Sequence, residues 1–529
     1  MENELKEGLP APAIEYIAKL ERRIEQLTEA LLNAQKARFG QSSEKKKYLL
    51  PDGWEQETLF NEAEAHANEK EPEPVLIAVE KHTRKAKRTK EELAKELPVK
   101  EITIDIPENE RQCDICEGSL HVVGKELIRR ELSIIPAEAY VTETYRVNYG
   151  CNDCLKETDE ANIVKPEVPE PVIKRGLASP GSAAYVMYQK YVNAMPLYRQ
   201  AEDWKRFGVT ISRATLANWI IYTSMHWLLP LWEQWKSILN KSPVILADET
   251  VVQVLKEPGK TPQSESRMWV YCTGDTGGPP ISLFEYQPNR SGDNPKRFLA
   301  EAKDFYLTTD GYAGYNTVTN AIHTGCFAHM RRKFADALPK TEKKGSKAAE
   351  GVAFCDKLFL LERGFQGLPH EERFKMRIEK SKPVLDAFFE WVDSVNPLAG
   401  SKLGAAIVYA RNQKARLSAF LLDGRIEIST NRIENQIRPF TVGRKNFLFC
   451  DTVSGARASA VAYSIIETAR ANGLNPYKYL LHLFTDLPTV LTKNPDADLS
   501  PFFPWSDGVQ DKCRVHSKDR EAVSRIDSL

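Results

Sequence analysis

The sequence lacks the features that would send a protein into or across a membrane. No uninterrupted apolar run approaches the roughly 18 residues from which a membrane-spanning helix is recognised. The first residues, MENELKEGLP, lack the basic-then-apolar order of a secretory signal peptide. We therefore expect the protein to stay in the cytoplasm and to have no membrane partner.

Net charge is absent as well, because Lys and Arg total 73 and Asp and Glu also total 73. This balance excludes a protein coated with basic surface, so any contact with nucleic acid must come from local patches. Cysteine is scarce, with 9 in 529 residues. Thiols stay reduced in the cytoplasm, so these cysteines predict metal ligands or small buried groups rather than disulfides. At this length the chain should divide into about three or four units with separate cores.

The N-terminal part predicts a helix that pairs with another helix. From Ile17 to Ala34, apolar residues recur at alternating spacings of three and four, which places them on one seam. We interpret this seam as a short coiled coil, with a helix docked on its own chain as the alternative. The following stretch is rich in Glu, Lys and Pro and contains KHTRKAKRTK at 81–90. It predicts a solvated linker or, alternatively, a basic arm on DNA phosphates.

Four cysteines form two closely spaced pairs. CDIC supplies Cys113 and Cys116, and CNDC supplies Cys151 and Cys154, with strand-like alternation between the pairs. Two Cys-x-x-Cys knuckles provide four thiolates at the spacing of a tetrahedral zinc site. We predict a zinc ribbon with one structural Zn²⁺, which would stabilise a module too small to build its own core. Two unrelated pairs, the alternative, would leave this short polar segment little to hold it folded.

Two helices joined by a short turn are predicted within LYRQAEDWKRFGVTISRATLANWI, residues 197–220. The turn lies around Gly208, and Ser212 is a plausible cap for the second helix. The inner face of that helix would carry Leu216, Trp219 and Ile220. This pattern matches a DNA-reading helix-turn-helix, and plain packing of two helices is an equal alternative.

Residues 244 to about 310 predict three strands joined by tight turns, then a helix, then a further strand. This order resembles the opening of an RNase H-like fold. In that fold the first strand, VILADETVVQVL, and the strand that begins FYLTTDGYAGYN lie side by side, which would bring Asp248 and Asp310 together. Two close carboxylates repel each other unless a cation sits between them. Mg²⁺ suits oxygen ligands, and two such ions can clamp the attacking and leaving oxygens of a phosphodiester.

A third acid is expected in ISTNRIENQIRPFTVGRKNFLF, residues 428–449. Thr430 or Asn431 would cap a short helix that Pro439 limits, with Glu434 one turn in. The basic residues that crowd around this acid and suggest nearby phosphates are Arg432, Arg438, Arg444 and Lys445. Glu427 and Glu467 are rival third ligands, and a surface ion-pair helix is the alternative reading. Residues 348–424, between the second and third acids, read as an all-helical insertion.

The segment IHTGCFAHMRRKFADAL follows the second acid. Its His323, Cys326 and His329 suggest zinc, but no fourth ligand is evident, so a metal site is not expected there. The basic residues after them lie on a predicted helix and could contact the DNA backbone, with a solvated helix face as the alternative. They are Arg331, Arg332 and Lys333.

Taken together, these segments resemble the large transposase of the IS-sixty-six family of bacterial insertion sequences. The matching pieces cover roughly residues 15–485 in the family's order. They are the zipper running into RFGQSSEK, the four-Cys ribbon, MPLYRQAEDWKRFGVTISRATLANWI, ADETVVQVL, TTDGYAGYN, CFAHMRRKF, NRIENQIRPFTVGRKNFLF and SIIETARANGLNPYKYLLHLF.

The resemblance implies a DDE-type DNA transposase in which Asp248, Asp310 and Glu434 bind two Mg²⁺ ions that cut and join insertion-sequence ends. It also implies a structural role for the Cys-x-x-His pair, Cys326 and His329. The sequence departs from the family's pattern where Asn435 follows the third acid in place of the usual Arg, which bears on nearby phosphate contacts.

The expected fold is therefore α/β, with an RNase H-like DDE core, a helical insertion, and coiled-coil, zinc-ribbon and helix-turn-helix modules before it. The expected division is coiled coil 1–48, charged linker 49–98, zinc ribbon 99–165, helix-turn-helix region 170–240, first part of the core 241–340, helical insertion 341–425, second part of the core 426–485 and tail 486–529. Expected partners are double-stranded DNA (terminal repeats and target), further copies in a homodimer or higher oligomer, and accessory proteins of the same element on the bacterial nucleoid. The alternatives are a zinc-containing DNA-binding regulator with an inactive core and a structure-selective nuclease.

Overall fold

The structure is a computed structural model that describes residues 139–151, 162–206, 208–339 and 345–515. The predicted coiled coil, the charged linker and most of the zinc ribbon therefore lie outside the described residues. Within the ribbon, β1 (Tyr149–Cys151) and β2 (Asn162–Val164) form an antiparallel pair in which Cys151 opposes Asn162. The elements described below belong to one compact unit, which includes Val141–Leu529.

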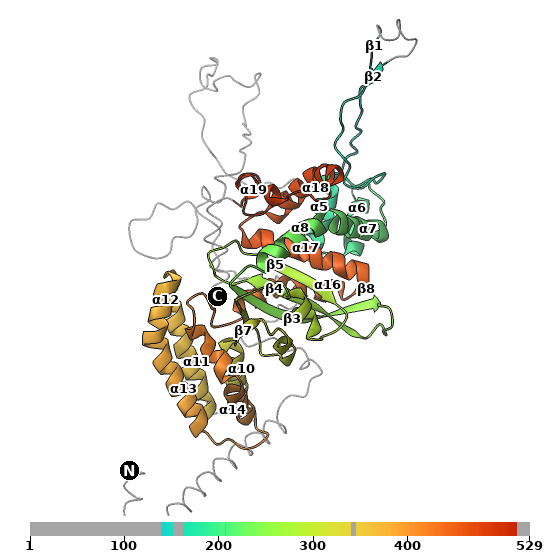
Figure 1. Cartoon of the computed structure of the whole chain (residues 1–529). Helices are drawn as coiled ribbons and strands as arrows, with labels where there is room; N and C mark the ends of the chain where they lie inside the picture. The colour runs from blue at the N-terminus through green and yellow to red at the C-terminus, as the bar shows by residue number, and fades with distance from the viewer. Residues whose placement is uncertain (1–138, 152–161, 207, 340–344, 516–529) are drawn as a thin grey trace, which may run out of the picture. The chain divides into compact units, whose positions relative to one another are not determined.

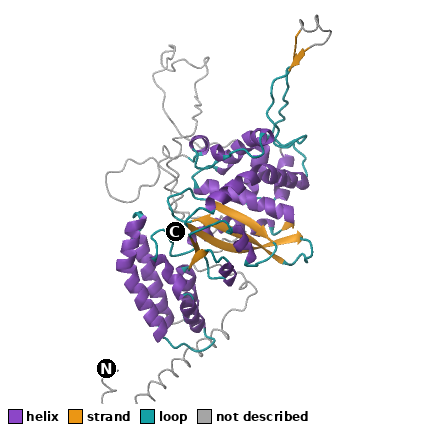
Figure 2. Cartoon of the chain, viewed as in Figure 1, coloured by secondary structure: helices purple, strands orange, loops and turns teal. Residues whose placement is uncertain are grey.

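A mixed sheet forms the centre of this unit (Figures 1 and 2). Its strand order is β5-β4-β3-β6-β7, and β8 pairs with the outer part of β3. The strands are β3 (Val244–Lys256), β4 (Glu265–Thr273), β5 (Ser282–Gln287), β6 (Phe305–Thr308), β7 (Ala321–Thr324) and β8 (Cys450–Thr452). The first three strands are antiparallel neighbours, whereas β6 lies parallel to β3 and β7 lies parallel to β6. The predicted adjacency of the first strand and the strand after the helix is confirmed.

Short helical segments connect β5 to β6 and β6 to β7. They are α9 (Asp293–Phe298) and η4 (Ala313–Thr317). The helix predicted around KRFLAEAK begins earlier than expected and ends at Phe298, where the backbone leaves the helical region at Leu299.

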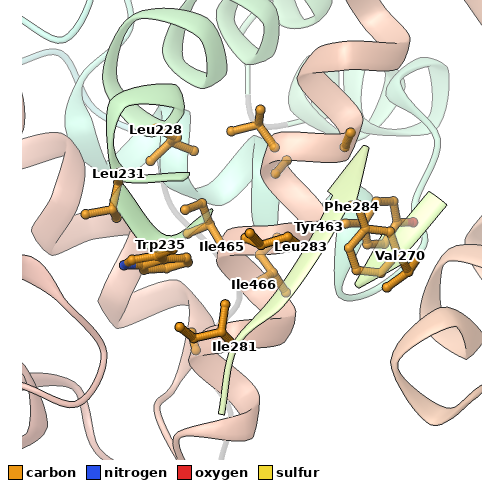
Figure 3. Close-up of a cluster of buried hydrophobic side chains, with 14 of the residues drawn as sticks. Leu228, Leu231, Trp235, Val270, Ile281, Leu283, Phe284, Tyr463, Ile465 and Ile466 are labelled. Carbon is orange, nitrogen blue, oxygen red and sulfur yellow. The ribbon is translucent and has the colours of Figure 1, made fainter. Parts of the chain in front are cut away.

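Helices cover the sheet and enclose a large apolar core (Figure 3). The helices that enclose this core with the sheet are α5 (Pro180–Tyr191), α6 (Leu197–Arg206), α7 (Arg213–Thr223), η3 (Ser224–Leu228), α8 (Leu229–Leu239), α17 (Val453–Ala471) and α18 (Pro476–Lys493). In the core, Trp235 of α8 and Ile466 of α17 lie close to Leu283 of β5. The chain then passes through η7 (Ser500–Phe502) to α19 (Asp507–Cys513), in which Val509 is buried.

Hydroxyl groups of α17 satisfy backbone groups at the outer edge of β5. Ser464 Oγ accepts a hydrogen bond from Phe284 N at 2.7 Å, and Thr468 Oγ1 accepts one from Ser282 N at 3.0 Å. Thr468 Oγ1 also donates to Ser282 O at 3.0 Å. An open sheet edge presents unpaired backbone groups to other chains. The polar residues on this otherwise apolar helix therefore close one edge of the sheet.

The two helices predicted for residues 197–220 are confirmed as α6 and α7. Gly208 lies in the turn with a φ of +84°, which favours glycine, and Ser212 Oγ accepts a hydrogen bond from Thr215 N at 3.1 Å. The rings of Trp204 and Trp219 pack at 5.9 Å. Whether this pair of helices reads DNA stays a prediction.

A second apolar core lies in a group of helices between the second and third acids (Figure 1). These helices are α10 (Phe327–Asp336), α11 (Lys347–Gly364), α12 (His370–Met376), η5 (Arg377–Ser381), α13 (Lys382–Ser394), α14 (Lys402–Asn412), α15 (Lys414–Ser418) and η6 (Ala419–Leu421). Phe327, Phe334 and Phe388 are fully buried in this core. The described residues from 345 to 424 contain no strand, in agreement with the predicted helical insertion.

The helix that carries Glu434 is longer than predicted. Helix α16 (Asn431–Phe447) continues through Pro439 to Phe447, so the expectation that this proline limits the helix is wrong. A proline inside a helix costs about 3 kcal/mol. The buried face of α16, which carries Ile433, Ile437 and Phe440, offsets this cost by packing into the core around the sheet.

None of the helices in the described residues is both long enough and apolar enough to cross a membrane.

Candidate active site

Two adjacent acids of β3 have different environments. Successive side chains of a strand point to opposite faces of the sheet, so Asp248 and Glu249 diverge. The Glu249 side chain is only 2% exposed, and its carboxylate accepts hydrogen bonds from Arg290 Nε at 2.6 Å and Tyr315 Oη at 2.7 Å. The guanidinium of Arg290 lies 3.8 Å from the centre of the Tyr312 ring. Glu249 is thus a buried, fully paired charge that the sequence analysis did not single out, although the strand alternation could have separated it from Asp248.

The second acid, Asp310, lies just after β6. Leu246 opposes Thr308 in the parallel pairing of β3 and β6, so Asp248 and Asp310 each lie two residues further along neighbouring strands. Asp310 Oδ1 accepts a hydrogen bond from Tyr312 N at 2.8 Å. Its backbone carbonyl accepts one from Tyr409 Oη of α14 at 3.0 Å. The turn that carries this carboxylate is therefore fixed from both sides.

Glycine is required directly after this acid. Gly311 has a φ of +92°, and a Cβ at this position would lie 3.2 Å from Tyr409 Oη. A side chain here would strain the backbone and crowd the tyrosine that holds the Asp310 carbonyl.

The third acid, Glu434, lies in the first turn of α16 and faces α10. Its carboxylate accepts a hydrogen bond from Thr430 Oγ1 at 3.3 Å. His329 Nδ1 lies 4.0 Å from Glu434 Oε1, and an Arg332 nitrogen lies 3.7 Å from Glu434 Oε2. Both partners belong to α10, which follows β7, so the helical insertion begins beside this acid.

Electrostatics links the predicted acids to one another. Burial raises the pKa of Asp248 to about 8, and the nearby carboxylates of Glu249, Asp310 and Glu434 add to the increase. The backbone N–H of Glu249, which donates to Asp248 Oδ1 at 2.8 Å, offsets part of it. Carboxylates raise each other's pKa only when they lie near one another. Asp248, Asp310 and Glu434 therefore share one electrostatic environment.

The rival acids have other partners. Glu427 forms an ion pair with Arg432 and accepts a hydrogen bond from Asp275 N at 3.2 Å. Glu467 lies on α17, where burial raises its pKa to about 7 and Arg470 binds it at 3.1 Å. Each rival carboxylate is thus held by an arginine of its own neighbourhood.

Cys326 lies at the boundary between β7 and α10 and contacts the start of α16. Its sulfur accepts hydrogen bonds from Thr430 N at 3.2 Å and from Thr430 Oγ1 at 3.1 Å. Burial alone would raise the pKa of the Cys326 thiol, but His329 and Thr430 outweigh this effect and lower it. Burial alone would lower the pKa of His329, but the contacts with Cys326 and Glu434 raise it. His323 lies apart from this group, with its Nε2 bonded to Val318 O at 2.9 Å.

The basic residues predicted to crowd around Glu434 are not all there. Arg432 binds Glu427, and Arg444 donates to Thr250 Oγ1 at 3.2 Å and to Val251 O of β3. For these two residues the expectation is wrong, because neighbours on a helix surface are three or four residues apart, whereas Arg432 is two and Arg444 is ten residues from Glu434. A cation that does lie near Glu434 is Arg332, which comes from a different helix.

The remaining basic candidates for DNA contact fall into two groups. Arg331 forms an ion pair with Asp356 at 2.6 Å, and Lys333 lies 4.6 Å from the centre of the Tyr409 ring. Arg438 and Lys445 are exposed on α16. Contact of any of them with DNA stays a prediction.

The three acids provide the donor atoms that Mg²⁺ prefers. In the described part of the chain, no set of three or more His, Cys, Asp or Glu side chains is arranged to hold a metal ion by itself. Mg²⁺ usually keeps several waters and is bound through one or two carboxylates together with substrate phosphates. A group of hard, mutually repelling oxygen donors next to a DNA phosphate fits this requirement.

Comparison with protein families gives four matches along the chain. "Transposase IS66 family" matches residues 175–458, which is more than half of the chain and includes the three acids. "Zinc-finger binding domain of transposase IS66" matches residues 110–154, with all four ribbon cysteines. "IS66 C-terminal element" matches residues 464–505, and "Transposase C of IS166 homeodomain" matches residues 26–102.

Similar proteins occur in Sinorhizobium fredii. The protein y4qI is 30% identical over 501 residues, which cover 92% of this chain and 89% of the relative. The protein y4jD is 30% identical over 431 residues, which cover 78% of this chain and 81% of the relative. Both carry the name "uncharacterized protein", so neither name brings an activity to this chain.

Proposed function

Since the chain belongs to the Transposase IS66 family, we propose that this transposase cuts and joins insertion-sequence ends with Asp248, Asp310 and Glu434 as its catalytic acids. The observation that carries the proposal is the raised pKa of Asp248, to which both other acids contribute after burial. Carboxylates that repel one another in a partly buried site have no structural benefit by themselves. Perturbed carboxyl groups of this kind cluster at catalytic sites.

We further propose that the central sheet is an RNase H-like core of the DDE type. The order of its strands supports this, because three antiparallel strands are followed by a helix and a parallel strand beside the first. Asp248 then lies on β3, and Asp310 lies just after the neighbouring strand β6. Glu434 lies on a helix that follows a long helical insertion. Each acid is thus placed by a different secondary-structure element.

The three acids would hold two Mg²⁺ ions. When bound, Mg²⁺ would supply positive charge that favours ionisation of the attacking hydroxyl and stabilises the leaving oxygen. The residues of the chain prepare this site. Asp248 must release the proton that its raised pKa retains, Tyr409 holds the turn of Asp310, and Thr430 orients Glu434.

DNA binding by the family's zinc-finger and homeodomain modules brings the substrate to this site. We propose that Cys113, Cys116, Cys151 and Cys154 bind one Zn²⁺, because four thiolates in two knuckles match tetrahedral coordination. Apart from the backbone of Cys151, these residues lie outside the described part. The seam from Ile17 to Ala34 would join two or more copies, and accessory proteins of the same insertion sequence would be further partners.

The contacts of Cys326 and His329 favour a structural role for these residues over a second metal site. Both residues contact the first turn of α16, where Glu434 lies. We propose that they fix this turn relative to the second acid. The exposed basic residues Arg438 and Lys445, together with Arg332 beside Glu434, are the proposed contacts for DNA phosphates near the site.

The test is Mg²⁺-dependent cleavage of insertion-sequence ends by the full-length protein. Asp248→Asn and Glu434→Gln should each lower cleavage by about 10³-fold or more, because an electrostatic contribution of about 4 kcal/mol to the transition state corresponds to that factor. Binding to the same DNA should stay within about twofold, because the zinc-finger and N-terminal modules are unchanged. Glu467→Gln, which changes a buried acid of α17, is the matched control and should retain cleavage.

Two outcomes would contradict the proposal. Retained cleavage in Asp248→Asn would remove this residue from the mechanism. A wild-type protein that binds the ends but never cuts them would favour a DNA-binding regulator with an inactive core.

A further inference from the structure

The outer end of α16 has an unusual backbone. The helix ends at Phe447, and the next residue, Leu448, has a φ of +62° and a ψ of −54°. Phe449 N donates a hydrogen bond to Phe447 O at 2.8 Å, which closes a three-residue γ-turn around Leu448. This positive-φ form of the γ-turn is rare and strained, and a leucine is poorly suited to it. Strain of this kind persists only where the surrounding structure imposes it.

The strained turn exposes two large apolar side chains. Leu448 is 62% exposed and Phe449 is 41% exposed. We name these two residues the apolar tip. Single exposed apolar side chains are common on protein surfaces. The tip is unusual because it joins two neighbouring exposed apolar side chains to a strained backbone.

The turn is nevertheless held firmly on both sides. Leu448 N donates to Arg444 O at 2.7 Å, and the Arg444 guanidinium is bonded to Thr250 Oγ1 and Val251 O of β3. Directly after the tip, β8 pairs with β3, with Cys450 opposite Val254. The tip thus projects from a rigid base rather than from a loose loop.

Positive charge flanks the apolar tip. Lys445 is exposed in the last turn of α16, just before the tip. Beyond β8, a hollow of about 490 Å³ is lined in part by Lys256, Ser454 and Arg457. Lys256 is paired with Asp451 at 2.7 Å, whereas Lys445 and Arg457 have no ion pair within the described residues. An apolar projection with unpaired cations before and after it along the chain suits a base step between two phosphate backbones.

The spacing between the tip and the acids can be estimated along two elements. Thirteen residues separate Glu434 from Phe447, which corresponds to about 20 Å of helix at 1.5 Å per residue. Six residues separate Asp248 from Val254, the residue opposite Cys450, which corresponds to about 20 Å of strand. At about 3.4 Å per base pair, 20 Å corresponds to about six base pairs of B-form DNA.

We propose that the apolar tip enters a base step of double-stranded DNA at an insertion-sequence end, about six base pairs from the bond that is cut. Lys445 and Arg457 then contact the phosphates on either side of this step. Inserted apolar side chains unstack the bases and kink the duplex, as in proteins that bend DNA from the minor groove. This inference rests on the proposed function, because the distance is counted from the catalytic acids.

The test replaces Leu448 by glycine, a residue that adopts a positive φ without strain. If the turn has only a structural purpose, Leu448→Gly should be at least as stable as the wild type and should act on DNA normally. If the tip inserts into DNA, the same variant should keep its stability and lose the distortion of the duplex. Leu360→Ala is the matched control, since Leu360 is also 62% exposed but lies on α11 in the helical insertion.

The readout is fluorescence of 2-aminopurine placed at successive positions of a duplex that carries an insertion-sequence end. Binding is measured in Ca²⁺, so that cleavage does not interfere. Wild-type protein and Leu360→Ala should raise the fluorescence severalfold near the sixth base pair, and Leu448→Gly should abolish the increase. Leu448→Gly should also lower Mg²⁺-dependent cleavage about 10-fold while its melting temperature is equal or higher.

An unchanged fluorescence increase in Leu448→Gly would overturn the inference, as would its absence in the wild type. Failure of the proposed function is separate. It would appear as cleavage that does not respond to Asp248→Asn, whereas the fluorescence of the bound duplex would still show whether the tip inserts.

Discussion

The two ends of α16 differ in what surrounds them. At the first turn, Glu434 contacts three polar side chains, Thr430 just before α16 and His329 and Arg332 of α10. At the last turn, Leu448 and Phe449 are apolar, exposed and attached to a strained backbone. One end buries charge, and the other exposes apolar surface.

This difference shows how a single helix can combine chemistry with DNA contact. A partly buried charge is tolerated only with hydrogen bonds or ion pairs around it, so the inner end is built from specific contacts. The outer end needs a fixed position rather than partners, and Arg444 and β8 provide it. Because a helix has a fixed rise per residue, the distance between the two ends does not vary.

Among variants that keep all three acids, we expect the largest change from replacing Cys326 at the inner end. Cys326→Ala removes the sulfur that accepts two hydrogen bonds from Thr430 and leaves the start of α16 without this anchor. Loss of a group that orients a metal ligand typically costs 10- to 100-fold in metal affinity or activity, so we expect cleavage to fall by about this factor. Cys326→Ser, which keeps a shorter acceptor, should recover part of the loss.

The measurement is Mn²⁺ binding by electron paramagnetic resonance together with the Mg²⁺ concentration for half-maximal cleavage. Cys355→Ala is the control, because Cys355 is buried in the helical core but contacts none of the acids. Equal losses in both alanine variants, with the same metal dependence, would reduce Cys326 to a packing residue.

The inner end also shows where sequence reasoning reaches its limit. The order of strands, which resembles the opening of an RNase H-like fold, predicted the adjacency of β3 and β6. The partners of Glu434 were not predictable in this way. Arg332 lies 102 positions away in the sequence, across the whole helical insertion. Such contacts depend on how helices pack, which local periodicity does not encode.

The outer end was harder still to predict. The sequence predicted a helix that Pro439 limits, and position 448 holds neither the glycine nor the asparagine that would mark a positive φ. Nearness to Glu434 in the sequence also gave a wrong expectation for Arg444, whose guanidinium binds β3. Residues with unusual geometry are expected where a local rule is broken for function.

Arg444 and Lys445, the two basic residues of the outer end, should respond differently to substitution, with smaller effects than that of Cys326→Ala. Arg444→Gln should lower the stability by about 1–3 kcal/mol, because buried hydrogen bonds from a charged donor to β3 are lost. Lys445→Gln should leave the stability within about 0.5 kcal/mol, as is usual for exposed positions. It should instead weaken DNA binding and reduce the salt dependence by about one counterion.

Thermal unfolding and DNA titrations at several salt concentrations measure both effects. The comparison fails if Lys445→Gln destabilises the fold as much as Arg444→Gln does. It also fails if removal of the Lys445 charge leaves the salt dependence unchanged.

We also expect a change in stability with pH at the inner end. Burial and neighbouring acids raise the pKa of Asp248 from 3.8 to about 8 without metal, so the folded state keeps a proton that the unfolded state has lost. The folded state therefore binds more protons between these two values, and stability must fall as pH rises through this window. Asp248→Asn removes the titration. In EDTA the melting temperature of the variant should therefore be higher than that of the wild type near pH 8. The gain should be about 2–4 °C for each kcal/mol of difference in the free energy of unfolding, and it should shrink toward about pH 5.

Mg²⁺ should reverse this order, because it stabilises only the protein that offers the ionised carboxylate. Glu467→Gln is the matched control, since burial also raises the pKa of Glu467, to about 7, but this acid lies beside Arg470 on α17. In EDTA, Glu467→Gln should also melt higher than the wild type at high pH. In Mg²⁺ it should still gain stability. If Asp248→Asn gains as much stability from Mg²⁺ as the control does, the inner end of α16 and its neighbouring strands do not form the metal site.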